Sequence, residues 1–363
     1  MSKIQKGTNL AIEEIIENHV KSGKSPGISV GLVNENETMT FNFGETKKDS
    51  GVVPTNKTIY EIGSMTKTFT TILAAQLQAE EIISLDEKIS KYLPELENSE
   101  FENKNVTLRH LLTHTSGISE FSVKTFASQI FSIMSTGKSR IVEYEYDTEK
   151  FLNYVSALKL KNSPGSTWMY SNLGFGLVGK ILERITGNSY DVLVKTHICD
   201  VLDMKDTGID VFESHKDELA VGYSFRGKQA DYWNVPAIEA AGSLYSTPSD
   251  MVKFLKANLG LSKTILYPVF EYCQNTKNTP KIPLSMKFFT KSVGISLHSF
   301  RAGWFVFPQE NVDILGHDGG TEGFSSFMCM NLGNQSAVVI LTNRAMKPVH
   351  KLGLSLLQEI NKK

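Results

Sequence analysis

The chain has 363 residues, of which 40% are hydrophobic and 21% are charged. These shares exclude a disordered chain, and the length allows a sizeable core without disulfides or metal ions. The 38 lysines and arginines nearly balance the 39 acidic residues, which argues against a general nucleic-acid binder, because such proteins carry a basic excess.

The cysteines and the N-terminus bear on the compartment. Cys199, Cys273 and Cys329 are far apart and form no Cys-x-x-Cys pair, so they are interpreted as three buried thiols in a reducing compartment. Glutamates interrupt any apolar signal region at the N-terminus, and no run approaches the ~20 apolar residues of a membrane span. The sequence as given predicts a cytoplasmic protein, or a periplasmic or extracellular one if a leader was removed from a mature form.

Strands are predicted at both ends of the chain and helices in its middle. Apolar residues at helical spacing predict a helix over 10–20, and two short β-prone runs at 28–36 and 38–45 predict a hairpin. The stretch 119–149 has weak periodicity and is a candidate flap or lid. Three further helical segments follow the same spacing rule: 64–83, 173–186 and 248–259.

The last part of the chain changes character. Five β-prone runs are separated by turn residues: 292–300, 301–308, 311–317, 323–332 and 336–344. Consecutive strands with short links predict an antiparallel sheet, and an amphipathic helix is predicted over 352–360. The simplest packing joins the N-terminal hairpin to this sheet, with a helical insert between them.

The strongest chemical motif is Ser-Met-Thr-Lys at 64–67, which begins a helical run after Gly63. Residues three apart share a helix face, so Ser64 and Lys67 are expected to be neighbours. A serine hydroxyl needs a base within hydrogen-bond distance, and burial beside a helix N-terminus favours the neutral amine that would serve. The same N-terminus offers a backbone N–H to an oxyanion. The alternative is a plain helix start with a solvated lysine, because Ser-x-x-Lys alone is common.

Two further motifs place polar groups next to turns. Tyr-Ser-Asn at 170–172 precedes a predicted helix and can present a phenol and an amide to one cleft; the plain alternative is a buried tyrosine and a capping asparagine. Gly-His-Asp-Gly-Gly-Thr at 316–321 lies between two predicted strands, where glycines let backbone approach a ligand. The plain alternative there is a hairpin turn with one surface histidine.

Taken together, the motifs resemble the serine β-lactamase and penicillin-binding superfamily, in the order and spacing of its class C branch with its esterases, DD-peptidases and D-aminopeptidases. Four stretches carry the resemblance: TIYEIGSMTKTFT at 58–70, LRHLLTHTSGI at 108–118, AAGSLYSTPSDMVKF at 240–254 and GHDGGTEGFSS at 316–326. It implies an α+β, β-lactamase/transpeptidase-like fold, in which helices flank an antiparallel sheet beside a mainly helical subdomain. The expected division is 1–63 with 285–363 for the sandwich and 64–284 for the helical part, with the active site in the cleft between them.

The resemblance also implies roles for single residues. Ser64 would be the acylated nucleophile, and Lys67 and Tyr170 would share the general-base and general-acid work. Asn172 would hold Lys67 and a substrate amide, and the N–H groups of Ser64 and Gly320 would form the oxyanion hole. The expected substrate-binding residues are Asn172, His317, Gly319 and Gly320. No cofactor or metal is implied, and water would hydrolyse the acyl-enzyme.

His317 departs from class C β-lactamases, which have a lysine at this position. A lysine is a fixed positive charge that attracts the carboxylate of a β-lactam, whereas a histidine is mostly neutral near pH 7 and still donates a hydrogen bond. Histidine also occurs here in DD-peptidase-like and D-aminopeptidase-like relatives, so it argues against efficient β-lactam hydrolysis. Asp318 and Glu322 add negative charge that suits neutral or cationic substrates, unless both side chains point to solvent.

Three other features have plainer interpretations. Gly-Ile-Ser-Val-Gly at 27–31 fits the nucleophile motif of α/β-hydrolases, but the apolar run continues past it, so its serine is expected in a strand. His110 and His114 have zinc-helix spacing without a glutamate between them, and the family resemblance implies a structural helix end and turn beneath the active site here. Tyr232 and Trp233 are candidates for lining an acyl pocket.

We therefore predict a serine hydrolase that acts through a Ser64 acyl-enzyme on an ester, or on an amide or peptide bond. The alternatives are a class C-type β-lactamase and a non-hydrolytic relative, such as a penicillin receptor or a structural assembly. The complete set of Ser64, Lys67, Tyr170 and Asn172 favours an enzyme. The expected partner is a small-molecule or peptide substrate, with a β-lactam as substrate or inhibitor; nucleic acid and a membrane span are not expected.

Overall fold

The computed structural model describes residues 3–23, 25–118, 147–211, 215–278, 280–283, 299–309, 312–347 and 349–362. The predicted flap or lid at 119–149 lies outside these residues except for its last three, where α6 (Thr148–Ser156) begins. Within the described ranges, no helix combines the length and the apolar character that crossing a membrane requires.

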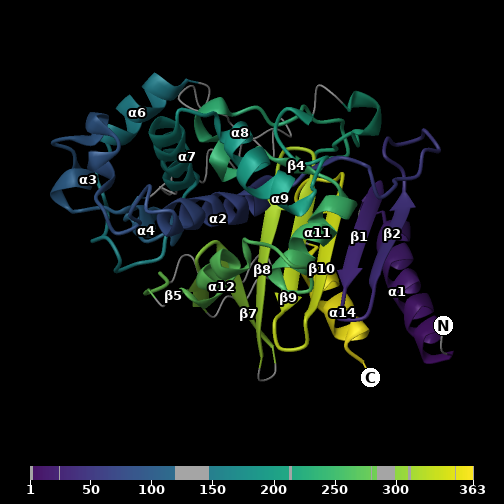
Figure 1. The fold of residues 1–363 in the computed structure, drawn as a ribbon. Coiled ribbons are helices and arrows are strands. Elements are labelled where there is room, and N and C mark those ends of the chain that lie inside the picture. Colours follow the sequence, from purple (N-terminus) through teal and green to yellow (C-terminus); the bar gives the residue numbers. More distant parts are fainter. Residues whose placement is uncertain are drawn as a thin grey trace.

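An eight-stranded antiparallel sheet lies at the centre of the fold, with the strand order β2-β1-β10-β9-β8-β7-β6-β5 (Figure 1). The strands are β1 (Gly27–Val33), β2 (Thr38–Gly44), β5 (Lys277–Asn278), β6 (Ser299–Arg301), β7 (Trp304–Gln309), β8 (Val312–Gly320), β9 (Ser325–Asn331) and β10 (Ser336–Thr342). β1 pairs with both β2 and β10, and Val30 lies opposite Ile340. The predicted union of the N-terminal hairpin with the C-terminal strands is therefore confirmed. The run 292–300 enters the described sheet only at its end, as part of β6.

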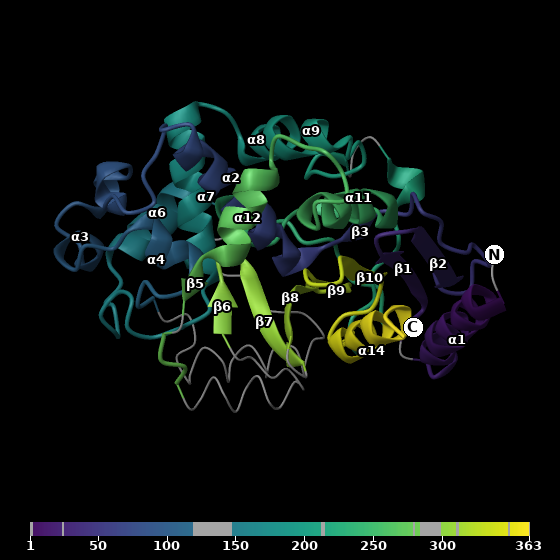
Figure 2. The same ribbon diagram turned by 60° about the horizontal axis from the view of Figure 1, so that its bottom comes forward.

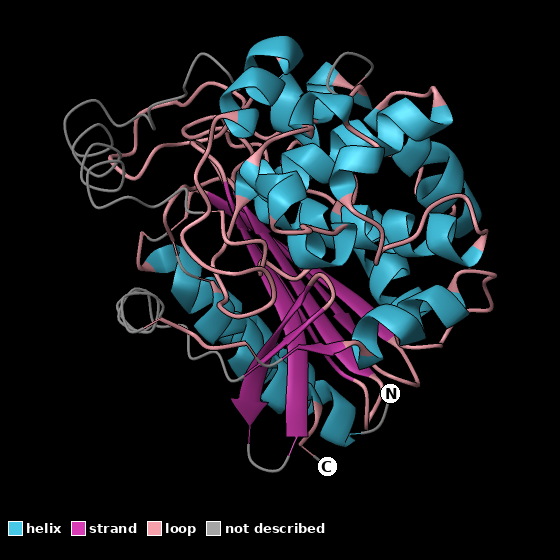
Figure 3. Ribbon diagram, turned by 90° about the vertical axis from the view of Figure 1, so that its left-hand side faces the viewer, coloured by secondary structure: helices cyan, strands magenta, loops and turns pink. Residues whose placement is uncertain are grey.

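Helices cover both faces of the sheet, as Figures 2 and 3 show. On one face α1 (Lys3–Lys21) contacts β2, and α14 (His350–Ile360) contacts β9 and β10. On the other face α11 (Pro248–Asn258) contacts β1 and β10, and α12 (Tyr267–Asn275) contacts β6. Apolar side chains of α1 and α14 form a core with the sheet: Ile12, Ile16, Leu356 and Leu357 are all at most 1% exposed. The predicted helices at both ends of the chain are confirmed.

A helical group lies at one end of the sheet, around the central helix α2 (Thr66–Ala79). Eleven of the fourteen residues of α2 are buried, the pattern of a helix surrounded by protein. The remaining described helices are α3 (Glu100–Asn103), α4 (Leu108–Leu112), α7 (Asn172–Thr186), α8 (Tyr190–Val194) and α9 (Asp200–Leu202), with a two-stranded sheet of β3 (Tyr60–Glu61) and β4 (Tyr245–Ser246). The predicted helix at 173–186 is confirmed.

The end of α2 differs from the prediction, and two other predictions concern the division of the chain and its cysteines. The helix predicted to reach Ile83 ends at Ala79, because Glu81 adopts a left-handed backbone (φ 59°) that an α-helix cannot contain. The division into 1–63 with 285–363 and 64–284 stays a prediction; α11 and β5, from the second range, lie against the sheet and within it. The three cysteines are free and buried, as predicted.

Candidate active site

Ser64 lies in the 3₁₀ turn η1 (Gly63–Met65), which continues directly into α2. The turn is held from two sides: Ser326 of β9 donates through Oγ to the Ile62 carbonyl (2.8 Å), and the Ile62 N–H donates to the Leu244 carbonyl (3.0 Å). Ser64 itself is half-buried. The nucleophile predicted from the sequence is therefore fixed between the interior strand β9 and the buried helix α2.

Gly63 is required at the start of this turn. Its φ is +52°, and a Cβ there would lie 2.7 Å from Gly320 N and 2.9 Å from Gly320 O, closer than side-chain carbons approach backbone. We expect Gly63→Ala to lower the free energy of unfolding by about 2 kcal/mol or more, from left-handed strain plus the displaced strand, and to lower hydrolytic activity at least about tenfold by moving Ser64. Chemical denaturation and steady-state kinetics measure both effects.

The matched control is Gly187→Ala, at the C-terminus of α7. Gly187 has a similar φ of +72°, but a Cβ there meets nothing within 4 Å. This variant should show only the left-handed strain, about 1 kcal/mol, and keep its activity. Equal losses in the two variants would contradict the close contact between Gly63 and Gly320.

Lys67 is completely buried and directs its amine at Ser64. Its Nζ donates to Ser64 Oγ (3.1 Å), to Asn172 Oδ1 (2.8 Å) and to the Ala241 carbonyl (2.6 Å). The alternative of a solvated lysine is therefore wrong. Three acceptors on three segments hold the amine in one place, which is the positioning that a proton-transfer group needs.

Tyr170 and Asn172 approach the same hydroxyl from the start of α7. Tyr170 Oη donates to Ser64 Oγ at 2.7 Å. Ser171 is the N-cap of α7, accepting the Gly174 N–H at 2.9 Å, so Asn172 is the first helical residue and its amide reaches Lys67. The alternative of a capping asparagine is wrong, because the serine before it caps the helix.

His317 lies on β8 and is 2% exposed, so the alternative of a surface histidine is also wrong. Its Nδ1 donates to the Asp318 carbonyl (2.6 Å), and its ring stacks on Phe305 with centroids 4.4 Å apart. Burial, together with the Lys67 charge, lowers the pKa of His317 to about 3. His317 is therefore neutral near pH 7 and supplies no positive charge to a substrate.

The two glycines after His317 differ in their surroundings. Gly319 packs so closely on the Ile62 carbonyl and Ser326 Oγ that no side chain fits, whereas Gly320 is exposed and has open space where a Cβ would stand. Asp318 and Glu322 are both half-buried, and the expectation that both point to solvent stays a prediction. Burial raises the pKa of Asp318, and His350 on α14 partly opposes this.

The structure thus brings four predicted residues into one hydrogen-bonded set: Ser64, Lys67, Tyr170 and Asn172. Gly320 lies beside the turn that holds Ser64, and the charge of Lys67 contributes to the lowered pKa of His317. One hydroxyl oxygen in contact with a phenol and an amine is an arrangement suited to nucleophilic acyl transfer. Among the described residues, no group of three His, Cys, Asp or Glu side chains has the geometry to hold a metal ion.

Two residues near this set were not predicted to act there. His114 follows α4 with a left-handed backbone (φ 57°), and its ring packs against the Tyr170 ring with centroids 4.5 Å apart. Glu61 lies three residues before Ser64 and is 3% exposed. Both residues fall within stretches that carry the family resemblance. For Glu61, the signal in the sequence was an acidic residue three positions before the candidate nucleophile.

Glu61 connects three segments around the site. It accepts hydrogen bonds from the Trp233 N–H (2.5 Å), Tyr245 Oη (3.3 Å) and Thr321 Oγ1. Burial raises its pKa to about 7, although these three donors oppose the rise. Trp233, a candidate for the acyl pocket, lies over Gly242, where a Cβ would meet the indole ring.

The raised pKa of Glu61 predicts a pH dependence of stability. Glu61 ionises near its ordinary value of 4.5 in the unfolded chain and near 7 in the fold, so the fold keeps a proton that the unfolded chain has lost between these values. Its contribution to stability is complete below about pH 4.5 and disappears as the pH rises through about 7. Relative to Glu61→Gln, the wild type should lose about 3 kcal/mol of unfolding free energy over this range.

Urea unfolding of both proteins from pH 4 to pH 8 measures the difference. The control is Glu87→Gln: that exposed carboxylate pairs with Lys91 at 2.8 Å, and exposed pairs contribute little. Parallel stability curves for wild type and Glu61→Gln would contradict a proton held on Glu61.

The other features of the sequence have structural positions, as predicted. Ser29 lies within β1, fully buried, with its Oγ 3.0 Å from Tyr60 Oη, so the α/β-hydrolase motif has no strand-to-helix turn. His110 Nδ1 accepts the Thr107 N–H (3.1 Å), and His114 Nδ1 accepts the Ser171 N–H (3.0 Å). α4 ends at Leu112, so the two histidines do not share a helix face.

The fold is that of the β-lactamase/transpeptidase-like class. The chain belongs to the beta-lactamase family: the family model described as Beta-lactamase matches residues 12–359. It is 24% identical over 351 residues to Protein flp of Staphylococcus aureus (strain MW2), covering 94% of this chain and 64% of that protein. It is 30% identical over 254 residues to a beta-lactamase of Providencia stuartii, covering 69% of this chain and 60% of that protein.

A solved structure described as a beta-lactamase/D-alanine carboxypeptidase from Pseudomonas syringae is similar in fold. The TM-score is 0.81 at 19% sequence identity, with 97% of this chain and 99% of that chain covered. The chain spans only about two thirds of the staphylococcal relative. The family and the fold are therefore established, and the activity is argued from the site.

Proposed function

We propose that this protein is a serine hydrolase that cleaves an ester or an amide bond through an acyl-enzyme on Ser64. The observation that carries the proposal is the double contact of one oxygen: Ser64 Oγ lies 2.7 Å from Tyr170 Oη and 3.1 Å from Lys67 Nζ. A serine becomes a nucleophile only beside a group that takes its proton, and here two such groups are in place.

The chemistry runs in two balanced halves. Ser64 Oγ bonds to the substrate carbonyl carbon, and its proton passes to whichever member of the pair is unprotonated, the neutral amine of Lys67 or the phenolate of Tyr170 beside the Lys67 ammonium. That group then gives the proton to the alcohol or amine, which leaves as its bond to the carbonyl carbon breaks. Water then adds to the acyl carbon, gives up a proton to the pair, and Ser64 leaves protonated. Asn172 and the Ala241 carbonyl hold the amine in place through both halves.

The developing oxyanion would be held by the N–H groups of Ser64 and Gly320. The contact of Gly63 with the Gly320 backbone supports this pairing, because it sets Gly320 N beside the peptide that leads into Ser64. Such donors are effective because they are fixed before the charge develops. Removing their alignment is what Gly63→Ala is expected to do.

The neutral His317 supports esters and amides that lack a carboxylate as the better substrates. A lysine in this place would attract the carboxylate of a β-lactam or a peptide C-terminus, and a buried neutral imidazole does not. The alternative of a class C-type β-lactamase draws its support from the Providencia stuartii relative, which is named a beta-lactamase. The two candidates differ in which substrate turns over.

The test is to compare hydrolysis of p-nitrophenyl acetate, D-alanine p-nitroanilide and benzylpenicillin by the same protein. We expect the ester or the D-amino-acid amide to be hydrolysed and benzylpenicillin to be the poorest of the three. Fast consumption of benzylpenicillin alone would establish the β-lactamase instead. A lasting penicilloyl adduct without hydrolysis of any substrate would establish a penicillin-binding receptor.

A further inference from the structure

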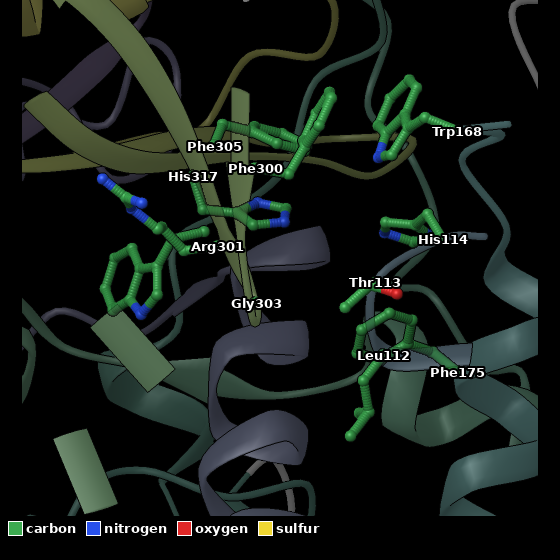
Figure 4. A pocket seen from close by; sticks show the side chains of 11 residues that line it. Leu112, Thr113, His114, Trp168, Phe175, Phe300, Arg301, Gly303, Phe305 and His317 are labelled. Atoms are coloured by element: carbon green, nitrogen blue, oxygen red, sulfur yellow. The ribbon is translucent and has the colours of Figure 1, made fainter. Parts of the chain in front are cut away.

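A small pocket beside Tyr170 is lined by two buried histidines, His114 from the turn after α4 and His317 from β8 (Figure 4). The rings of Trp168 and Phe305 form further parts of the wall; Arg301 also lines the pocket, and its guanidinium donates to Asp313 at 3.0 Å. Its volume for the centre of a water-sized sphere is about 10 Å³, which is room for about one water molecule. The pocket is therefore too small for a substrate group.

His114 carries its proton on Nε2. Its Nδ1 accepts the Ser171 N–H at 3.0 Å, so Nδ1 holds a lone pair. Burial, followed by the charge of Lys67, holds the pKa of His114 well below its usual value, so the ring is neutral. A neutral imidazole has one N–H, and Nε2 is the nitrogen left to carry it.

His317 has the opposite tautomer. Its Nδ1 lies 2.6 Å from the Asp318 carbonyl oxygen, which can only accept, so Nδ1 carries the proton. The ring is neutral for the reasons given above. Its Nε2 is therefore a bare acceptor, and Figure 4 shows the His317 and His114 rings facing one another across the pocket.

Trp168 supplies a second donor. Its side chain is 2% exposed, and among the described residues its Nε1 has no hydrogen-bond partner. A buried N–H without a partner costs about 1–3 kcal/mol, so such groups are normally satisfied by protein or by ordered water. Figure 4 shows the indole nitrogen on the pocket side of the ring.

We propose that this pocket binds one water molecule, which accepts from His114 Nε2–H and Trp168 Nε1–H and donates to His317 Nε2. Two donors and one acceptor match the hydrogen-bonding capacity of water. An anion would face the lone pair on His317, and a metal ion would face two N–H groups. Water is the small ligand that fits all three atoms.

The water joins the two walls of the active site, and His114 is a positioning residue on one of them. His114 holds the segment that carries Tyr170 twice, through its Nδ1 to Ser171 and through its carbonyl to the Met169 N–H at 2.7 Å. Through the water, the same side chain is bonded to β8 at His317. This positioning role rests on the proposed function, whereas the water site does not.

The water site is tested without any substrate. Nitrogen-15 NMR of histidine-labelled protein near pH 7 should show the Nε2–H tautomer for His114 and the Nδ1–H tautomer for His317. A crystal structure at atomic resolution should show one water within hydrogen-bond distance of His114, Trp168 and His317. The reversed tautomers, or a pocket without water density, would overturn the proposal whether or not the protein is an enzyme.

The positioning role is tested with variants at the pocket. Trp168→Phe removes one donor, and His114→Leu removes both the other donor and the acceptor for Ser171. We expect kcat for the best substrate to fall about tenfold in the first and further in the second, with KM little changed, since the reacting groups shift by a fraction of an ångström. His114→Asn, which tolerates the left-handed backbone and keeps an acceptor, should recover part of the loss.

The matched control is Phe300→Leu, which changes the apolar wall of the same pocket, where Phe300 stacks on the Trp168 ring with centroids 4.2 Å apart, but removes no polar atom. It should keep both tautomers, the water and kcat within about twofold of the wild type. An equal loss of kcat in Phe300→Leu and Trp168→Phe would reduce the role to packing and overturn it. A wild type without hydrolytic activity would instead defeat the proposed function, and the NMR result would still decide the water site.

Discussion

Replacing Ser64 by alanine should lower kcat/KM for the best ester or amide substrate by about 10⁴-fold or more, because no other group in the set can form the acyl-enzyme. Ser64 is half-buried and its hydroxyl contacts Lys67 and Tyr170 of the site, so the thermal unfolding midpoint should stay close to that of the wild type. Steady-state kinetics with p-nitrophenyl acetate and a thermal scan measure both quantities.

Ser29→Ala is the matched control for this variant. Ser29 lies in the stretch 27–31, which fits the nucleophile motif of α/β-hydrolases, and it is buried in β1 against Tyr60. This variant should lose about 1 kcal/mol of stability, from the unpaired Tyr60 hydroxyl, and keep full activity below its unfolding transition. Retained activity in Ser64→Ala together with lost activity in Ser29→Ala would reverse the assignment.

Lys67→Met should produce the second largest effect. The variant keeps the length and the apolar stem of the side chain but removes the amine that contacts Ser64, Asn172 and Ala241. We expect the rate of acylation to fall about 10³-fold, the range of general-base contributions. The change in stability should be small in comparison, because a buried charge and its desolvation cost disappear together with its hydrogen bonds.

Stopped-flow measurement of the first turnover separates acylation from deacylation in this variant. Lys91→Met is the control, since Lys91 is exposed and pairs with Glu87 on the surface; its kinetics should match the wild type. An acylation rate in Lys67→Met within tenfold of the wild type would assign the proton transfer to Tyr170 alone.

The sequence predicted the elements whose signal is local. The alternation in 28–45 and the run of C-terminal strands gave the sheet, and the helices at 173–186 and 248–259 match their apolar periods to within one residue. The end of α2 was missed because Leu77 and Ile83 both continue the apolar spacing, while the left-handed residue Glu81 that ends it has no local signature.

The site was predictable where a motif places two groups by chain geometry. Ser64 and Lys67 meet because they are three residues apart on one helical turn. The contact of Tyr170 with Ser64 spans 106 residues and came only from the family resemblance. Glu61 and His114 were missed as members of the site because their partners, Thr321, Trp233 and Ser171, are brought to them by tertiary structure.

The central claim is that Ser64 forms a covalent acyl-type bond, and labelling by a fluorophosphonate tests it most directly. Such a reagent leaves a phosphonyl group on an activated serine that water does not readily remove, so intact-protein mass and peptide mapping locate it. We expect one phosphonyl group per chain, on Ser64, which is absent in Ser64→Ala and forms far more slowly in Lys67→Met. Label on another residue, or an unlabelled protein that hydrolyses the ester, would contradict it.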